Sequence, residues 1–151
     1  MDKCAPRMDW KHDEFTLTDD QNRIDLEEVC NLLRGTYWAE KRAREAIRKS
    51  VRHSLSFAIL HGKKLVGFAR VITDRATVGY LCDFVIASKF RARGLGRWML
   101  AQILDHPDLQ GCRIDLFTRD AQEFYHGFGF GPHLFTSMVR YPDGDGERNS
   151  Q

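Results

Sequence analysis

The sequence predicts a single-domain α/β protein built on a mixed β-sheet. Its apolar residues change from helical to extended spacing near residue 55, and the helical spacing returns only after three consecutive extended runs. The chain has 151 residues, of which 42% are hydrophobic, enough for one domain with a substantial core. This order of helical and extended segments favours a mixed sheet covered by helices.

Two helices are predicted before the extended runs. A short apolar segment at 15–17 precedes Asp19 and Asp20, either of which could cap a first helix that ends at Gly35. Its apolar residues lie on roughly one face: Ile24, Leu26, Val29, Cys30 and Leu33. A second, strongly charged helix is expected over 40–51, with a narrow apolar stripe and a solvated outer face.

Three antiparallel strands are predicted next, over 55–60, 64–73 and 77–87. The first two flank the short sequence HGK, which is typical of a hairpin turn. The third run is almost continuously apolar, so we expect it to be central in the sheet.

The last third of the chain is expected to supply two more helices and two more strands. Helical spacing around residues 98–104 ends at His106-Pro107, where proline breaks the pattern. A strand is predicted over 113–118, then a short helix opened by Asp120 and Glu123 as a capping box. A final strand is predicted over 134–141.

The composition limits the classes of partner. The polar segments 1–13 and 142–151 are expected to be mobile, which leaves 14–141 as the domain. The formal charge is only +2, so no nucleic-acid partner is expected. No apolar run approaches the ~20 residues that span a bilayer, and the opening residues lack a signal-peptide pattern, so we expect a cytoplasmic protein with no membrane partner. Widely spaced cysteines predict no metal site.

A segment rich in arginine and glycine, FRARGLGRWML at 90–100, stands where a helix is expected to begin. Gly94 and Gly96 permit positive φ, so the backbone N–H groups could converge on an anion. The helix dipole favours the same ligand. Four basic residues could bind phosphate oxygens: Lys89, Arg91, Arg93 and Arg97. We expect this segment to bind a pyrophosphate. The alternative is that the two glycines form a tight turn and the basic residues only keep that turn solvated. P-loop and dinucleotide fingerprints are both absent.

This segment and its context resemble the GCN5-related N-acetyltransferase (GNAT) superfamily. The family signature [RQ]-x-x-G-x-[GA] is matched by the run from Arg91 to Gly96, although Ala92 stands where many members have glycine. The downstream stretch DAQEFYHGFGF, at 120–130, is similar to the family's tyrosine-bearing helix and glycine-phenylalanine turn. The resemblance covers about 15–141 and implies a mainly antiparallel central sheet with helices on both faces. The implied activity is transfer of an acetyl group from acetyl-CoA to a primary amine, by direct attack in a ternary complex.

The resemblance also implies a site for acetyl-CoA as co-substrate, with no metal. It would lie where the strand ending at residue 87 diverges from the strand over 113–118. Backbone groups of one strand would pair with the pantetheine arm: Phe84, Val85 and Ile86. The glycine segment would hold the pyrophosphate: Arg91, Arg93, Gly94, Leu95, Gly96 and Arg97. A strand N–H near Phe84 or Val85 would face the thioester oxygen.

Two residues are candidates for proton transfer. By resemblance, Tyr125 would protonate the departing CoA thiolate; the alternative is a tyrosine that only packs. Asp83 could act as a base through water, or serve as a structural hydrogen-bond partner. YLCDFVIASKFRARG is similar to the polyamine acetyltransferase pattern, except that Cys82 replaces its glutamate. Both Cys82 and Asp83 could face the site only if a β-bulge intervenes, and Cys82 is a poor candidate nucleophile.

The acceptor is expected to be a small-molecule or peptide amine. Tyr37 and Trp38 could form an aromatic wall for it, or could cap the core instead. Glu40 or Asp74 could attract a cation. The sequence leaves open whether the protein forms a homodimer. The competing function is a non-catalytic acyl-CoA sensor, or a module that binds anions or nucleic acid through the basic cluster.

Overall fold

The computed structural model describes residues 6–142, and its framework is a six-stranded sheet in the order β1-β2-β3-β4-β5-β6. Neighbouring strands are antiparallel, except β5 and β6, which are parallel. The strands are β1 (Asp9–His12), β2 (Phe15–Thr18), β3 (Leu55–His61), β4 (Lys64–Thr73), β5 (Val78–Ile86) and β6 (Arg113–Asp115). The helices are α1 (Leu26–Arg34), α2 (Arg44–Arg52), α3 (Leu95–Leu104) and α4 (Gln122–His126), with 3-10 turns at Gln21–Arg23, Ser88–Phe90 and Pro107–Leu109.

The contacts of the chain divide it into two compact units, Met1–Phe117 and Thr118–Gln151. The first unit holds the whole sheet with α1, α2 and α3, and the second holds α4. The two units are therefore described separately. That residues 14–141 form a single domain stays a prediction.

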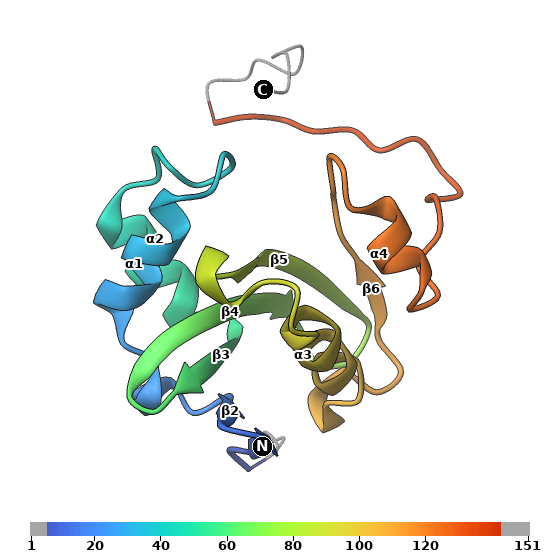
Figure 1. Ribbon diagram of the computed structural model, residues 1–151. Helices are drawn as coiled ribbons and strands as arrows, with labels where there is room; N and C mark the ends of the chain where they lie inside the picture. Colours follow the sequence, from blue (N-terminus) through green and yellow to red (C-terminus); the bar gives the residue numbers. More distant parts are fainter. Residues whose placement is uncertain (1–5, 143–151) are drawn as a thin grey trace. The chain divides into compact units, whose positions relative to one another are not determined.

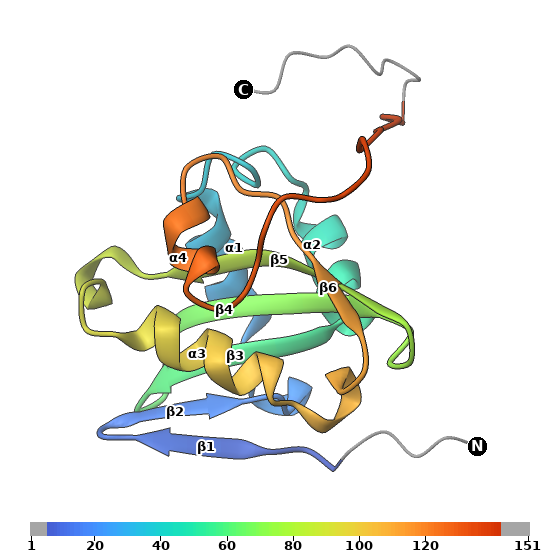
Figure 2. The same ribbon diagram turned by 90° about the vertical axis from the view of Figure 1, so that its right-hand side faces the viewer.

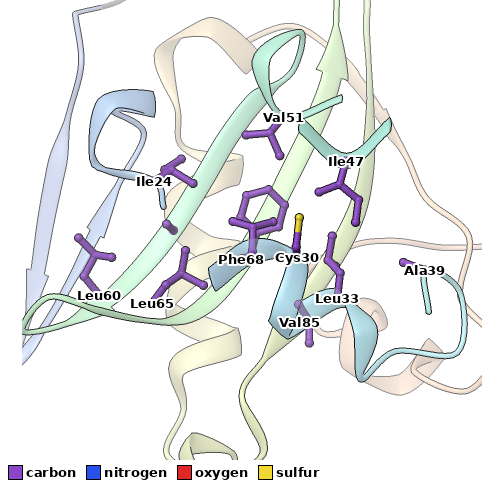
Figure 3. Packing of buried hydrophobic residues seen from close by; sticks show 12 residues of the cluster. Ile24, Cys30, Leu33, Ala39, Ile47, Val51, Leu60, Leu65, Phe68 and Val85 are labelled. Carbon is purple, nitrogen blue, oxygen red and sulfur yellow. The ribbon is translucent and has the colours of Figure 1, made fainter. Parts of the chain in front are cut away.

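Helices cover both faces of the sheet in the first unit, as the sequence predicts. Figures 1 and 2 show α1 and α2 on one face and α3 on the other. Figure 3 shows the core under α1 and α2, with Phe68 of β4 at its centre. Ala58 and Leu60 belong to this core, so the alternation of side chains turns the buried Phe57 and Ile59 toward the opposite face. The fold class is therefore confirmed.

The bounds of the three-stranded meander match their prediction closely. β4 has the predicted bounds, β3 is one residue longer, and β5 is one residue shorter at each end. The expected central place of the third strand is wrong, because β5 is the fifth of six strands. The turn between β3 and β4 contains Gly62 at φ +62°, a conformation that suits glycine. Local signals were enough here because each strand pairs with its neighbour along the chain.

The N-terminal part of the fold differs from its prediction in three places. Residues 9–12 were expected in a mobile segment but form the edge strand β1, held by the Trp10 ring against Phe57 and His106. Asp20 caps a 3-10 turn, and it is Asp25 that caps α1, since Ile24 is extended between them. The second helix, expected from residue 40, begins at Arg44 after a turn-rich stretch.

Three C-terminal expectations are also wrong. β6 ends at Asp115, although a strand to residue 118 was expected. Residues 134–141 contain no strand, and four of their apolar side chains are exposed: Leu134, Phe135, Met138 and Val139. A segment with high β-propensity forms a strand only where a neighbouring strand hydrogen-bonds to its backbone. Asp120 does not cap α4, because the N-cap residue is Ala121, whose N–H donates to the Thr118 hydroxyl. The predicted mobile segment 142–151 lies, apart from Pro142, outside the described residues.

Candidate functional site

The glycine segment forms the N-terminus of α3. Gly94 is the N-cap residue at φ +79°, and Ala92 is also left-handed at φ +60°. Gly96 lies inside the first turn of α3, so the expectation of positive φ is right for Gly94 and wrong for Gly96. The left-handed backbone at Ala92 explains why glycine would suit that position.

Donors at this helix end remain for a ligand. The first helical hydrogen bond runs from the Trp98 N–H to the Gly94 carbonyl, and no side chain caps the helix. The N–H groups of Leu95 and Gly96 precede that bond and belong to the first turn, whose N–H groups have no acceptor one turn earlier in the helix. Together with the positive end of the helix dipole, this geometry favours an anion.

The basic residues of the segment are held close to the loop. Arg91 donates through Nε to the Ile86 carbonyl at 3.0 Å. The Arg93 guanidinium lies over the Phe90 ring, 5.3 Å from its centroid, and its Nη1 is 4.0 Å from the Glu14 carboxylate. Both side chains therefore add positive charge beside the start of α3.

β5 and β6 diverge. They pair over only three positions, from Val78 opposite Arg113 to Tyr80 opposite Asp115. Further along β5, Val85 and Ile86 pair with β4, and the described residues of β6 offer them no partner on the other edge. The second half of β5 thus lies outside the ladder with β6, and the resemblance implies that the pantetheine arm pairs there.

A β-bulge interrupts β5 at Asp83. Arg70 of β4 pairs with Cys82 and Phe68 pairs with Val85, so two residues of β5 stand opposite one of β4. Asp83 takes up the irregularity with φ +54°. The bulge satisfies the condition under which Cys82 and Asp83 can both approach the same face, because Arg70 lies opposite Cys82 and contacts the Asp83 carboxylate.

The Asp83 carboxylate is buried and fully engaged. Its Oδ2 accepts from Arg42 Nη1 at 2.8 Å and from Arg70 Nε at 2.7 Å, and its Oδ1 accepts from Trp38 Nε1 at 3.1 Å. Burial alone would raise the pKa of Asp83, but the hydrogen bonds from Arg42 and Arg70 outweigh it and hold the pKa below its ordinary value. Of the two roles predicted for Asp83, these contacts favour the structural partner over the base.

Cys82 and Tyr80 flank this carboxylate on the same strand. Burial raises the pKa of the Cys82 thiol to about 11, so the group stays protonated and is a weak nucleophile near neutral pH. Burial also raises the pKa of Tyr80, whose ring packs edge-on against Phe117 at 5.8 Å. Neither residue is poised as a proton acceptor.

The predicted aromatic wall lies next to Asp83. The Tyr37 and Trp38 rings are half-exposed and meet edge to face at 5.0 Å, and Trp38 donates to the carboxylate. Asp74, by contrast, accepts from the backbone of its own turn at Ala76 and Thr77. That turn precedes β5, ~20 Å along the strand from Asp83 at about 3.3 Å per residue, so Asp74 is not at this site.

Tyr125 lies on α4 in the second unit. Its ring packs against Phe124 at 5.0 Å and Phe130 at 5.7 Å, both nearly edge to face. These contacts give the ring a defined environment within its own unit, and its role as an acid stays a prediction.

Arg42 and Arg70 were missed in the sequence. Arg70 carried a signal, because an arginine inside the otherwise apolar strand KLVGFARVIT needs a buried partner. Arg42 carried none, since it is one of many charged residues before α2.

The N-terminus of α3, the divergence of β5 from β6 and the bulge at Asp83 all lie within one mixed α/β sheet framework. The sequence profile of the Acetyltransferase (GNAT) family matches residues 12–130. The chain therefore belongs to the GNAT family of acetyltransferases.

Similar proteins agree with this assignment. A solved structure from Xanthomonas campestris pv. campestris, assigned to the GNAT family, superposes with a TM-score of 0.81 at 34% identity, covering 86% of this chain and 94% of that one. The uncharacterized N-acetyltransferase ycf52 of Gracilaria tenuistipitata var. liui is 31% identical over 126 residues, 80% of this chain and 69% of the relative. Its counterpart from Pyropia yezoensis is 27% identical and covers 94% of this chain and 84% of the relative.

Two further properties concern residues 6–142 only. Within this range no three or more His, Cys, Asp and Glu residues are grouped as a metal site would require. Nor does any helix of that range have the length and apolar character needed to cross a membrane.

Proposed function

We propose that the chain is an N-acetyltransferase that transfers the acetyl group of acetyl-CoA to a primary amine by direct attack in a ternary complex. The observation that carries the proposal is the divergence of β5 from β6 after Tyr80, followed in the chain by the N-terminus of α3, which no side chain caps. An extended pantetheine arm can pair with such an edge, and a pyrophosphate suits such a helix end.

The reaction needs charge stabilisation at one oxygen and one proton donor. The amine nitrogen attacks the thioester carbon, and the carbonyl oxygen becomes negative as the tetrahedral state forms. A backbone N–H near Phe84 or Val85 stabilises that oxygen. As the carbon–sulfur bond breaks, the thiolate takes up a proton, for which the family resemblance implies the Tyr125 hydroxyl as donor; the attacking nitrogen gives up a proton to water, and water returns a proton to the tyrosine.

Asp83 acts here as a positioning residue. Its carboxylate joins β5 to the loop between α1 and α2 through Arg42 and Trp38. The bulge at Asp83 displaces the strand just before Phe84, where the thioester would lie. The contacts support a role in holding the acceptor loop against the acyl site.

The test is mass spectrometry of the purified protein with acetyl-CoA and a panel of amines. We expect bound CoA under native conditions and an amine heavier by one acetyl group. Retention of CoA without any acetylated amine would overturn the enzymatic function and favour the acyl-CoA sensor. Absence of CoA binding would remove the cofactor site as well.

A further inference from the structure

We propose, building on the acetyltransferase function above, that the acceptor amine also carries an oxyanion, a carboxylate or a phosphate, and that Arg42 binds it. The proposal starts from the charges around Asp83. Two guanidinium groups, those of Arg42 and Arg70, contact one carboxylate, so the cluster has a net charge of +1. Such a cluster attracts anions and repels cations.

The two arginines differ in how many of their guanidinium N–H donors are used within the protein. Arg70 donates two hydrogen bonds, from Nε to the Asp83 carboxylate and from Nη1 to the Ser54 hydroxyl, and its side chain is only 10% exposed. Arg42 uses only Nη1, and its side chain is 27% exposed. Among the described residues, the Arg42 guanidinium has no hydrogen-bond or ion-pair partner besides Asp83. Its Nε and Nη2 donors are therefore available, and their planar spacing suits a carboxylate or phosphate.

Arg42 lies close to the expected acyl site. It belongs to the loop between α1 and α2, four residues after Trp38 in the chain. Its Nη1 is 2.8 Å from the Asp83 carboxylate, and Asp83 directly precedes Phe84, the expected position of the thioester. An amine held at the thioester could thus extend a short anionic arm to Arg42.

The same charges disfavour a polycationic acceptor. Cys82 stands where the polyamine pattern has glutamate, and its raised thiol pKa keeps it neutral. Asp83 is the remaining carboxylate, and two guanidinium groups already neutralise it. A positive cluster also lowers the pKa of a nearby ammonium group, which increases the share of neutral, nucleophilic amine.

The first experiment compares matched acceptors on the wild-type protein. The probes are β-alanine with a carboxylate, β-alaninamide as its neutral match, O-phosphoethanolamine with a phosphate, and putrescine as a dication. CoA release gives kcat/KM, corrected for the fraction of neutral amine. We expect at least one oxyanion acceptor to exceed β-alaninamide by about tenfold or more, equivalent to about 1.4 kcal/mol, and putrescine to be poorest.

The second experiment assigns the preference to Arg42. In R42Q, the ratio of kcat/KM for the oxyanion acceptor to that for β-alaninamide should fall by about tenfold. R42K keeps the charge without the planar fork and should retain part of the preference. R52Q removes an exposed arginine at the end of α2 and should keep the wild-type ratio.

The outcomes separate this proposal from the one on which it rests. Acetylation of β-alaninamide or putrescine as fast as of the oxyanion acceptors would overturn the oxyanion preference and leave the acetyltransferase function intact. An oxyanion preference that survives R42Q would overturn the assignment to Arg42. If neither the probes nor any amine in the wider panel is acetylated, both the oxyanion preference and the acetyltransferase function are overturned. Because the acceptor comparison uses the wild-type protein, it decides the preference even if R42Q fails to fold.

Discussion

Replacement of Asp83 by asparagine should destabilise the protein strongly. Asparagine keeps the size of the side chain and, like aspartate, tolerates the left-handed backbone at φ +54°. The substitution therefore removes the charge with little change in shape. Two guanidinium groups, those of Arg42 and Arg70, then lose the one anionic contact that each makes within residues 6–142.

The size of the effect follows from the burial of the three groups. Breaking a buried ion pair by removing one partner costs about 3–5 kcal/mol. Asp83 is 2% exposed and Arg70 is 10% exposed, but Arg42 is 27% exposed and recovers part of its hydration. We therefore expect the free energy of unfolding to fall by about 2–4 kcal/mol near neutral pH.

The loss should depend on pH in a defined direction. The folded-state pKa of Asp83 lies below its unfolded value, so the stability from its charge is fully present above the unfolded pKa, at about 3.9. That stability is lost as pH falls through the lower, folded-state pKa. The difference between wild type and D83N should therefore shrink only in acid.

Urea denaturation at neutral pH and at several acid pH values measures this difference. Asp13→Asn is the matched control, because Asp13 has φ +50° but an 83% exposed side chain. The control should change stability by less than about 0.5 kcal/mol. A D83N loss below about 1 kcal/mol at neutral pH, or one of equal size in acid, would refute the role of the buried charge.

Three further variants test the acyl site. Tyr125→Phe should lower kcat by about 10²–10⁴ and alter the high-pH limb of its profile, with little change in melting temperature, because it keeps the ring and loses the proton donor; unchanged turnover would leave Tyr125 a packing residue. Gly96→Val should raise the acetyl-CoA dissociation constant by about tenfold, since Gly96 is helical and the added side chain would enter the space over the α3 N-terminus. Calorimetry showing wild-type affinity in the folded variant would exclude this loop from the cofactor site. Ala92→Gly should stabilise the protein by about 0.5–1 kcal/mol, because removing about 1–2 kcal/mol of left-handed strain outweighs the extra chain entropy of glycine; chemical denaturation showing no gain would contradict this.

The sequence by itself determined the parts of the fold whose partners are near in the chain. The meander of β3, β4 and β5 joins neighbouring strands, so three extended apolar runs and the HGK turn between the first two were enough to predict it. The start of α3 was equally local, because Gly94 and the arginines around it mark a helix N-terminus within a few residues. The family signature lies in that same short segment, which is why the family could be recognised early.

Only the tertiary structure decided what surrounds Asp83. Its partners Trp38 and Arg42 are 45 and 41 residues away in the chain, and no local pattern links a loop residue to a strand at that distance. The bulge that turns Asp83 toward them depends on the register of β5 against β4. Conversely, residues 134–141 had the composition of a strand and formed none. Hydrogen-bond partners and buried charges are chosen by packing across the whole fold, because a buried charge is stable only where an opposite one meets it.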